Sequence, residues 1–200
     1  MDRAFLQEDG QSDPNRDSVV LSQDEQKRLS RLRLTLDEAG VDYTIFAHAE
    51  TVTSAEKGVE KGFGTLATMA PTLILNSEQG CIAAIISGET RLVYKKIRAT
   101  LGLKNVSLAR PDLVQRVTGS QIGTVALVNQ GLPTIIDIRL RAFDVVYGGC
   151  GVPRHTLRIS VSDLIKVAQA RLFDFTEPKD TATSRRENSS APTTSRETPD

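Results

Sequence analysis

The sequence predicts an α+β fold in which a mixed β-sheet is flanked by helices. Helix and strand patterns alternate along the chain, which is typical of sheets covered by helices. Within this alternation, the apolar stretch 70–87 is interrupted by Ser-Glu-Gln-Gly, a turn sequence that predicts an antiparallel hairpin. Since a purely parallel sheet contains no hairpin, the two observations together favour a mixed sheet. The chain has no Trp and only 4% aromatic residues, so we expect an aliphatic core.

The first half of the chain carries clear start and stop signals. Ser-Gln-Asp-Glu at 22–25 is a capping box, and leucines at helical spacing follow it up to a glycine, which predicts the first helix. A strand is expected over 41–48, and a short helix is expected to begin at Thr53 with its own Thr-x-x-Glu pattern. After the hairpin 70–87, an amphipathic helix is expected over 91–102, because a glycine ends the pattern there.

The second half of the chain predicts shorter elements. A strand is expected from Val106, and a helix is expected over 111–119, where Pro stands at the start and Gly at the end. The remaining apolar stretches predict strands over 132–138, 143–148 and 156–160 and a last helix from Ser160 through about Leu172.

We expect one domain over 22–176 between two polar ends. Residues 1–21 are acidic and are predicted to be disordered or loosely attached. Residues 177–200 hold nine Ser or Thr and no aliphatic side chain larger than Ala. Because such a segment buries too little apolar surface to offset its ordering entropy, we predict a disordered tail.

The polar ends conceal a positive charge on the predicted domain. The whole chain has 25 basic and 25 acidic side chains, whereas 22–176 has 19 bases and 15 acids, which weakly favours an anionic partner. The chain has no run of 18 apolar residues, no secretory signal at its start, and two cysteines far apart. We therefore expect a cytoplasmic protein with no membrane span and with reduced thiols.

The stretch Tyr-Gly-Gly-Cys-Gly-Val-Pro-Arg-His at 147–155 raises three interpretations. Cys150 and His155 suggest a nucleophile pair, a metal loop, or a close approach of backbone to a ligand. The two His and two Cys are scattered and do not supply the three or four ligands of a zinc site, so we expect no metal. By composition alone, Gly123, Gly149 and Gly151 belong to turns, with a ligand pocket as the second interpretation.

Two further features are consistent with binding. His48 ends a predicted strand just before a helix, where ligand contacts often lie, although a surface or capping histidine is at least as good an interpretation. A run of bases without acids lies further along the chain, which is typical of a solvated helix face but also of contacts to nucleic-acid phosphates. These bases are Arg91, Lys95, Lys96, Arg98 and Lys104.

The order of these motifs resembles the YbaK family, the aminoacyl-tRNA editing domains related to the insertion domain of bacterial prolyl-tRNA synthetase. The resemblance covers most of residues 29–173 and rests on "FAHAETVTSAEKG", on the stretch from the hairpin to "RVTG", on "IGTVALVNQGLPTIID", and on "LRISVSDLIKVAQA". The stretch 117–137 is the most specific, because Thr-Gly, a second Gly, and Leu-Pro-Thr-Ile-Ile-Asp recur there in the family's order.

The resemblance implies a mixed sheet flanked by helices and hydrolysis of mischarged aminoacyl-tRNA, with no metal, no cofactor and no covalent nucleophile. It implies that backbone groups of glycine-rich loops hold the aminoacyl carbonyl and position a water molecule, so that preorganised donors carry the catalysis. The bases from Arg91 to Lys104 would then contact tRNA phosphates. The implied substrate-binding residues are His48, Thr72, Gly123, Asp137, Gly149, Cys150 and Gly151.

Two departures from the family pattern keep a second function open. The family's pocket lysine precedes the first hairpin strand as Lys-Thr-Leu, whereas this chain has Pro71 before Thr72 and Leu73. The family's Gly-x-x-x-Pro loop keeps Gly123 but has Leu127 in place of the proline. We therefore expect an aminoacyl-tRNA deacylase, with a catalytically impaired module that binds aminoacyl-tRNA or a small molecule as the alternative.

Overall fold

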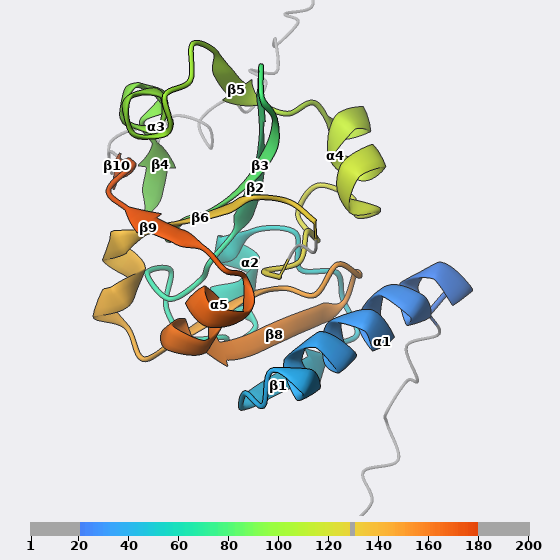
Figure 1. Ribbon diagram of the computed structural model, residues 1–200. Helices are drawn as coiled ribbons and strands as arrows, with labels where there is room; N and C mark the ends of the chain where they lie inside the picture. Colours follow the sequence, from blue (N-terminus) through green and yellow to red (C-terminus); the bar gives the residue numbers. More distant parts are fainter. Residues whose placement is uncertain (1–20, 129–130, 180–200) are drawn as a thin grey trace, which may run out of the picture.

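The computed structural model describes residues 21–128 and 131–179 (Figure 1). The predictions for 1–20 and 180–200 lie outside the described residues. The helices are α1 (Gln23–Glu38), α2 (Ala55–Glu60), α3 (Tyr94–Leu101), α4 (Pro111–Thr118), α5 (Val161–Val167) and the 3₁₀ helix η1 (Ile138–Ala142). The strands are β1 (Tyr43–Ala47), β2 (Thr72–Ser77), β3 (Gly80–Ile85), β4 (Thr90–Leu92), β5 (Val106–Leu108), β6 (Thr134–Asp137), β7 (Val145–Gly149), β8 (His155–Ser160), β9 (Arg171–Phe173) and β10 (Thr176–Pro178).

The predicted mixed sheet is confirmed. Five strands pair in the order β5-β2-β3-β6-β9. The predicted hairpin β2–β3 is antiparallel, as is β2–β5, whereas β3–β6 and β6–β9 are parallel. Between β3 and β6 the chain passes through β4, α3, the edge strand β5 and α4, and β6 then enters the sheet beside β3 in the same direction.

A second sheet lies beside the first and forms part of the wall of the site. Its three strands are antiparallel in the order β1-β8-β7. Single parallel bridges join β7 to flanking segments, at Met69–Tyr147 and at Ala126–Gly149. The strand β7 therefore brings the glycine-rich stretch next to both the entry to β2 and the segment that follows α4.

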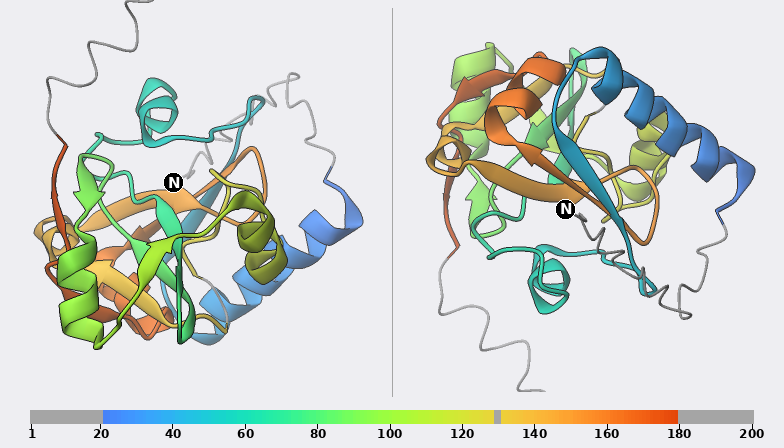
Figure 2. Two further views of the ribbon diagram at one scale, coloured as in Figure 1. Left: turned by 90° about the horizontal axis from the view of Figure 1, so that it is seen from above. Right: turned by 90° about the horizontal axis from the view of Figure 1, so that it is seen from below.

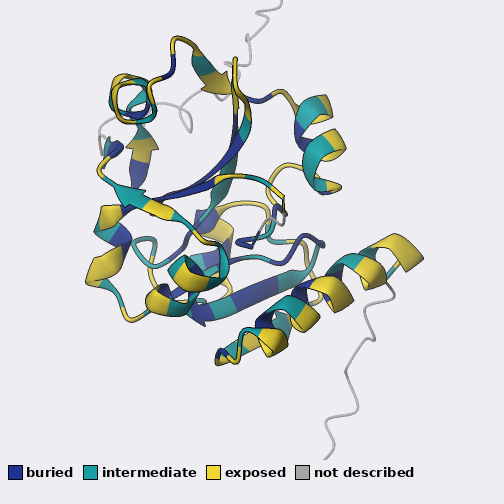
Figure 3. Cartoon of the chain, in the orientation of Figure 1, coloured by how far each residue is buried: buried dark blue, intermediate teal, exposed yellow. Residues whose placement is uncertain are grey.

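The helices α3 and α4 cover opposite faces of the five-stranded sheet (Figure 1). Side chains alternate between the faces of a strand, and Leu75 packs in one cluster with Ile97 of α3. Its neighbour Ile74 packs in another cluster with Val114 of α4. The largest cluster lies between α1, α5 and the second sheet, and α1 turns its leucines inward toward it while its outer face is exposed (Figure 3).

Several predicted boundaries need correction. The helix after β8 ends at Val167 rather than Leu172, because Gln169 takes a positive φ of 48° and the next residues pair with β6 as β9. Ser54, not Thr53, caps α2 by accepting a hydrogen bond from the N–H of Lys57. The capping box of α1 is confirmed, since Ser22 and Glu25 bond reciprocally.

The end of the folded region and the basic segment also differ from the prediction. The strand β10 pairs with β4, so regular structure extends to Pro178 rather than to 176. Arg91 lies in β4, not in a helix, because this pairing draws it into a two-stranded ribbon. Lys104 follows the end of α3, which Gly102 terminates with a positive φ of 68°. None of the helices in the described part of the chain combines the length and apolarity that a membrane span requires.

Candidate active site

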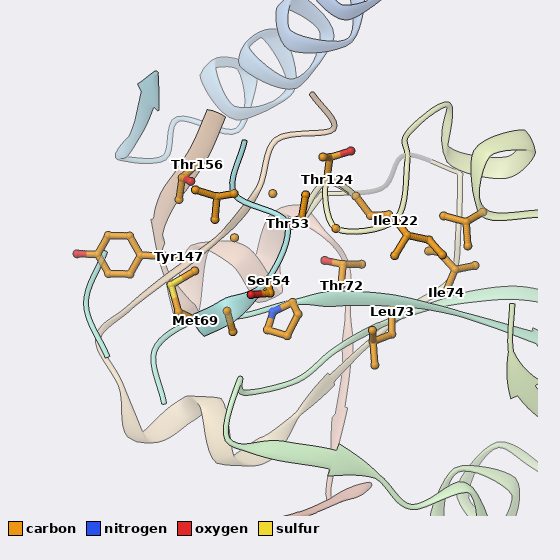
Figure 4. A pocket seen from close by; sticks show the side chains of 18 of the residues that line it. Thr53, Ser54, Met69, Thr72, Leu73, Ile74, Ile122, Thr124, Tyr147 and Thr156 are labelled. Atoms are coloured by element: carbon orange, nitrogen blue, oxygen red, sulfur yellow. The ribbon is translucent and has the colours of Figure 1, made fainter. Parts of the chain in front are cut away.

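A cavity of about 190 Å³ lies where the two sheets meet on the α4 side of the five-stranded sheet (Figure 4). Its walls come from the segment between β1 and α2, the start of β2, the loop after α4, and the facing ends of β7 and β8. This volume is below the range of roughly 300–1,000 Å³ that is usual for drug-sized ligands, so the cavity suits a small group.

Apolar side chains line most of the cavity and also form its rim. Met69, Ile74 and Val125 are buried in the wall. Leu108 and Ile122 line the same cavity but are 52% and 57% exposed, which is unusual for large apolar side chains in this domain. Among the lining residues none is Asp, Glu, Lys or Arg. An apolar group with no formal charge is therefore the best-matched occupant.

Two hydrogen-bonding groups of the wall have no partner within the described residues. The hydroxyl oxygen Oγ1 of Thr72 is buried and makes no hydrogen bond there. Gly123 lies in the loop after α4, and its N–H donates to no described residue. Because an unpaired buried polar group is unfavourable, the Thr72 hydroxyl is suited to bind the polar part of a ligand. Gly123 is exposed, so its N–H can serve as a second donor to the same ligand.

A histidine–threonine pair completes the polar part of the wall. The Nδ1 atom of His48 lies 2.6 Å from the carbonyl oxygen of Glu50, so this nitrogen carries the proton and donates it. In the neutral ring Nε2 is then an acceptor, and it lies 3.1 Å from Oγ1 of Thr156. The Thr156 hydroxyl must donate to His48, which leaves its lone pairs for the cavity that it lines.

The environment of His48 favours the neutral ring that this arrangement needs. Partial burial is the main cause that lowers the pKa of His48 below its usual value of 6.5, and the positive charges of Lys61 and Arg154 act in the same direction, together with His155. The hydrogen bond to Glu50 opposes this shift without reversing it. His48 is therefore uncharged at neutral pH and can accept a proton through Thr156.

The glycine-rich stretch packs tightly against the loop that follows α4. A Cβ atom on Gly149 would overlap the carbonyl oxygen of Val125, and one on Gly123 would overlap the backbone of Thr53. The backbone oxygen of Gly149 accepts from Leu127, and the N–H of Gly151 donates to the oxygen of Thr124. These glycines therefore permit close backbone approach, and two of the groups expected to contact a ligand are already bonded within the protein.

Cys150 and His155 do not meet. Cys150 is 1% exposed and faces a separate groove, whereas His155 lines the cavity. Burial raises the pKa of Cys150 to about 12, so its thiol stays protonated at neutral pH. The thiolate is the nucleophilic form of cysteine. The nucleophile interpretation of this stretch is therefore not supported by its geometry.

Asp137 was expected near the substrate but serves the fold. Asp137 is buried and does not line the cavity. Its carboxylate accepts hydrogen bonds from the backbone N–H groups of Arg139 at 2.9 Å and Phe175 at 3.2 Å, and it pairs with the Arg139 guanidinium. Asp137 thus fixes the chain between η1 and the C-terminal strands, on a side of β6 away from the cavity.

The structure brings four of the predicted substrate residues or positions to the cavity: Pro71, Thr72, Gly123 and Gly149. His48 reaches it through Thr156, while Cys150, Gly151 and Asp137 lie elsewhere. The sequence did not single out Thr53, Thr124, Tyr147 or Thr156, because isolated Thr and Tyr residues in strands and loops carry no motif. Within the described residues no group of three or more His, Cys, Asp and Glu is arranged to hold a metal ion.

The five bases predicted to contact tRNA lie away from this cavity. Arg91 pairs with Glu177 at 2.9 Å, and Lys96 pairs with Asp174 at 2.8 Å. The others are Lys95 and Arg98 on α3 and Lys104 beyond its end. Since α3 and the cavity lie on opposite faces of the five-stranded sheet, these bases do not adjoin the candidate site.

Comparison with known proteins places this architecture among translation-editing domains. A model of the aminoacyl-tRNA editing domain matches residues 48–167. The proline–tRNA ligase of Moorella thermoacetica is 33% identical over 70 residues, which are 34% of this chain and only 12% of the ligase. The crystal structure of a candidate trans-editing enzyme for prolyl-tRNA synthetase matches with a TM-score of 0.66 at 25% identity, over 79% of this chain and 99% of that chain. The structure of the hypothetical protein APE2540 matches with a TM-score of 0.68 at 24% identity, over 74% and 99% of the two chains, and shows the shared fold.

Proposed function

Because the chain belongs to the aminoacyl-tRNA editing domain family, we propose that it hydrolyses the ester between a small, misattached amino acid and the 3′ end of tRNA. The observation that carries this proposal is the small apolar cavity with the unpartnered Thr72 hydroxyl in its wall. An aminoacyl ester has the matching parts, a side chain for the apolar wall and a carbonyl oxygen for a hydrogen-bond donor.

The site contains groups for both halves of ester hydrolysis. The Thr72 hydroxyl and the Gly123 N–H can donate to the oxygen that becomes negative as water adds to the carbonyl carbon. Thr156 Oγ1 can accept a proton from that water while it passes its own proton to Nε2 of His48. When the carbon–oxygen bond to the ribose breaks, the proton returns to the ribose oxygen. The products are the free amino acid and tRNA with an intact 3′ end.

A deacylation screen tests this proposal. Purified full-length protein is mixed with a panel of aminoacyl-tRNAs, correctly charged and mischarged, and the release of labelled amino acid is followed over time. We expect release above the spontaneous rate for one or a few small apolar amino acids and none for large or charged ones. Equal release for all amino acids would contradict a role for the cavity in selection.

The alternative function is a module that binds aminoacyl-tRNA or a small molecule without hydrolysing it. One observation favours it, because Pro71 lines the cavity at the position where the family pattern has lysine, and proline has neither a side-chain donor nor an N–H. Binding of aminoacyl-tRNA without release of any amino acid in the same screen would support this alternative.

A further inference from the structure

We propose that the groove between α1 and α4 binds the phosphodiester backbone of tRNA next to its 3′ end. This inference rests on the proposed function for its choice of nucleic acid, whereas the charged side chains that carry it line the groove and not the cavity. The groove has a volume of about 440 Å³. The helix α1 precedes the matched editing region of residues 48–167, so the groove is built partly by a segment outside the family match.

The charges on α1 are arranged along one face. Asp24, Lys27, Arg28 and Arg31 all line the groove, and their spacing of three, four and seven residues places them in one stripe of the helix. The buried Leu29, Leu32 and Leu36 hold the helix on the domain by an adjoining stripe. The groove therefore receives three cationic side chains and one carboxylate from a helix that is fixed in place.

These cations are available to a partner. Lys27 lies 3.9 Å from Asp24, and both side chains are more than three-quarters exposed, so this pair is weak. Arg31 is exposed, and the structure gives it no acidic partner within the described residues. Arg28 donates from Nε to the carbonyl oxygen of Gly151 at 3.1 Å, which anchors the guanidinium over the glycine-rich stretch. Three cations of this kind match a chain of phosphates.

The groove and the cavity share a wall. Gly149 and Val125 line the cavity, while the residue that follows each of them, Cys150 and Ala126 respectively, lines the groove. A strand bound along α1 would therefore pass close to the aminoacyl site.

The alternative basic surface on α3 lies far from this wall. In Figure 1 and in both views of Figure 2, α3 and α1 lie on different sides of the domain, whereas α4 lies next to α1. Acids of the C-terminal segment neutralise two of the five bases there. The arrangement of charge around the cavity thus favours α1 over α3 as the surface that receives tRNA.

Matched double variants test the proposal. Lys27→Gln with Arg31→Gln removes two exposed cations from the groove, and Lys95→Gln with Arg98→Gln removes two from α3. Binding of uncharged tRNA is measured as a function of salt concentration. Each lost contact to a single strand flattens the slope of log K against log salt by about 0.7, so the groove variant should lose about 1.4 in slope and bind roughly ten- to thirtyfold more weakly near 0.1 M salt.

The α3 variant should keep the wild-type slope. A loss that is equal in the two variants, or confined to the α3 variant, would overturn the proposal. With tRNA that lacks its single-stranded 3′ end, we expect the groove variant and the wild type to bind alike. A persisting difference would place a duplex region in the groove and overturn the assignment of the 3′ end.

The failure of this proposal can be distinguished from the failure of the proposed function. Hydrolysis of a short aminoacyl-adenosine, which cannot reach along the groove, should be the same in the groove variant and the wild type. If the wild type hydrolyses no aminoacyl-tRNA but the groove variant shows the predicted flatter salt dependence of tRNA binding, the groove proposal holds and the deacylase proposal fails. If hydrolysis is found and the groove variant binds tRNA as the wild type does, the deacylase stands without the groove.

Discussion

Thr156→Val should lower kcat for ester hydrolysis by about a hundredfold, the lower range for the loss of general-base assistance. Valine has nearly the shape of threonine but no hydroxyl, so water in the cavity would lose its route to Nε2 of His48. KM should change little, because the apolar wall is preserved. Single-turnover rates on the preferred aminoacyl-tRNA measure the effect.

The dependence on pH distinguishes proton transfer from a structural role of Thr156. His48 must be neutral to accept the proton, and its pKa lies below 6.5, so wild-type activity should hold through neutral pH and fall only in more acidic solution. The groups that set this limit include Glu50, Lys61, Arg154 and His155. In Thr156→Val the residual activity should no longer fall in acidic solution. Thr156→Ser should keep this acidic fall and most of the wild-type rate. A Val variant as active as the Ser variant would show that His48 takes no part.

Pro71→Lys should raise the hydrolysis rate by up to about a hundredfold, which is the scale of one preorganised donor to a developing oxyanion. Pro71 is half-buried in the cavity wall, where no lining residue is Asp, Glu, Lys or Arg, so a lysine there would supply the only ammonium group of the lining. The change removes no hydrogen bond made by Pro71, because its carbonyl oxygen, which accepts from Ile86, is retained.

A neutral side chain of similar length is the control for Pro71→Lys. If the ammonium group of the lysine causes the gain, Pro71→Met should leave the rate near the wild-type value. If removal of the rigid proline ring causes it, Pro71→Met should be as fast as Pro71→Lys. A wild type that is already fast, with no gain in the lysine variant, would mean that Thr72 and Gly123 suffice. No hydrolysis in either protein would favour the binding module.

Local signals predicted the elements that depend on neighbouring residues. The capping box of α1, the hairpin β2–β3 and the proline and glycine at the two ends of α4 all appear where the sequence placed them. Arg171–Phe173 continued an apolar helical pattern but forms a strand, because parallel pairing with β6 outweighs local propensity. The pairing of β10 with β4 was invisible for the same reason, since it joins residues more than eighty positions apart.

The candidate site was predictable only in part. The family resemblance led to Pro71, Thr72 and Gly123, and these residues do line the cavity. The hydrogen bond between His48 and Thr156 joins residues 108 positions apart, which meet only because β1 pairs with β8. No local sequence pattern indicates such a contact. Asp137 shows the reverse case, because a buried acid at a strand end has the same pattern whether it binds substrate or, as here, backbone N–H groups.

The central claim is that the small cavity binds the aminoacyl end of tRNA. Its most direct test is an NMR titration of isotope-labelled protein with an aminoacyl-adenosine analogue whose ester is replaced by a stable amide. The account predicts saturable shifts of the amide signals of Thr72, Gly123 and Thr156, with smaller changes on α3. Shifts confined to α3 or to the surroundings of Cys150, or no shifts at saturating analogue, would contradict it.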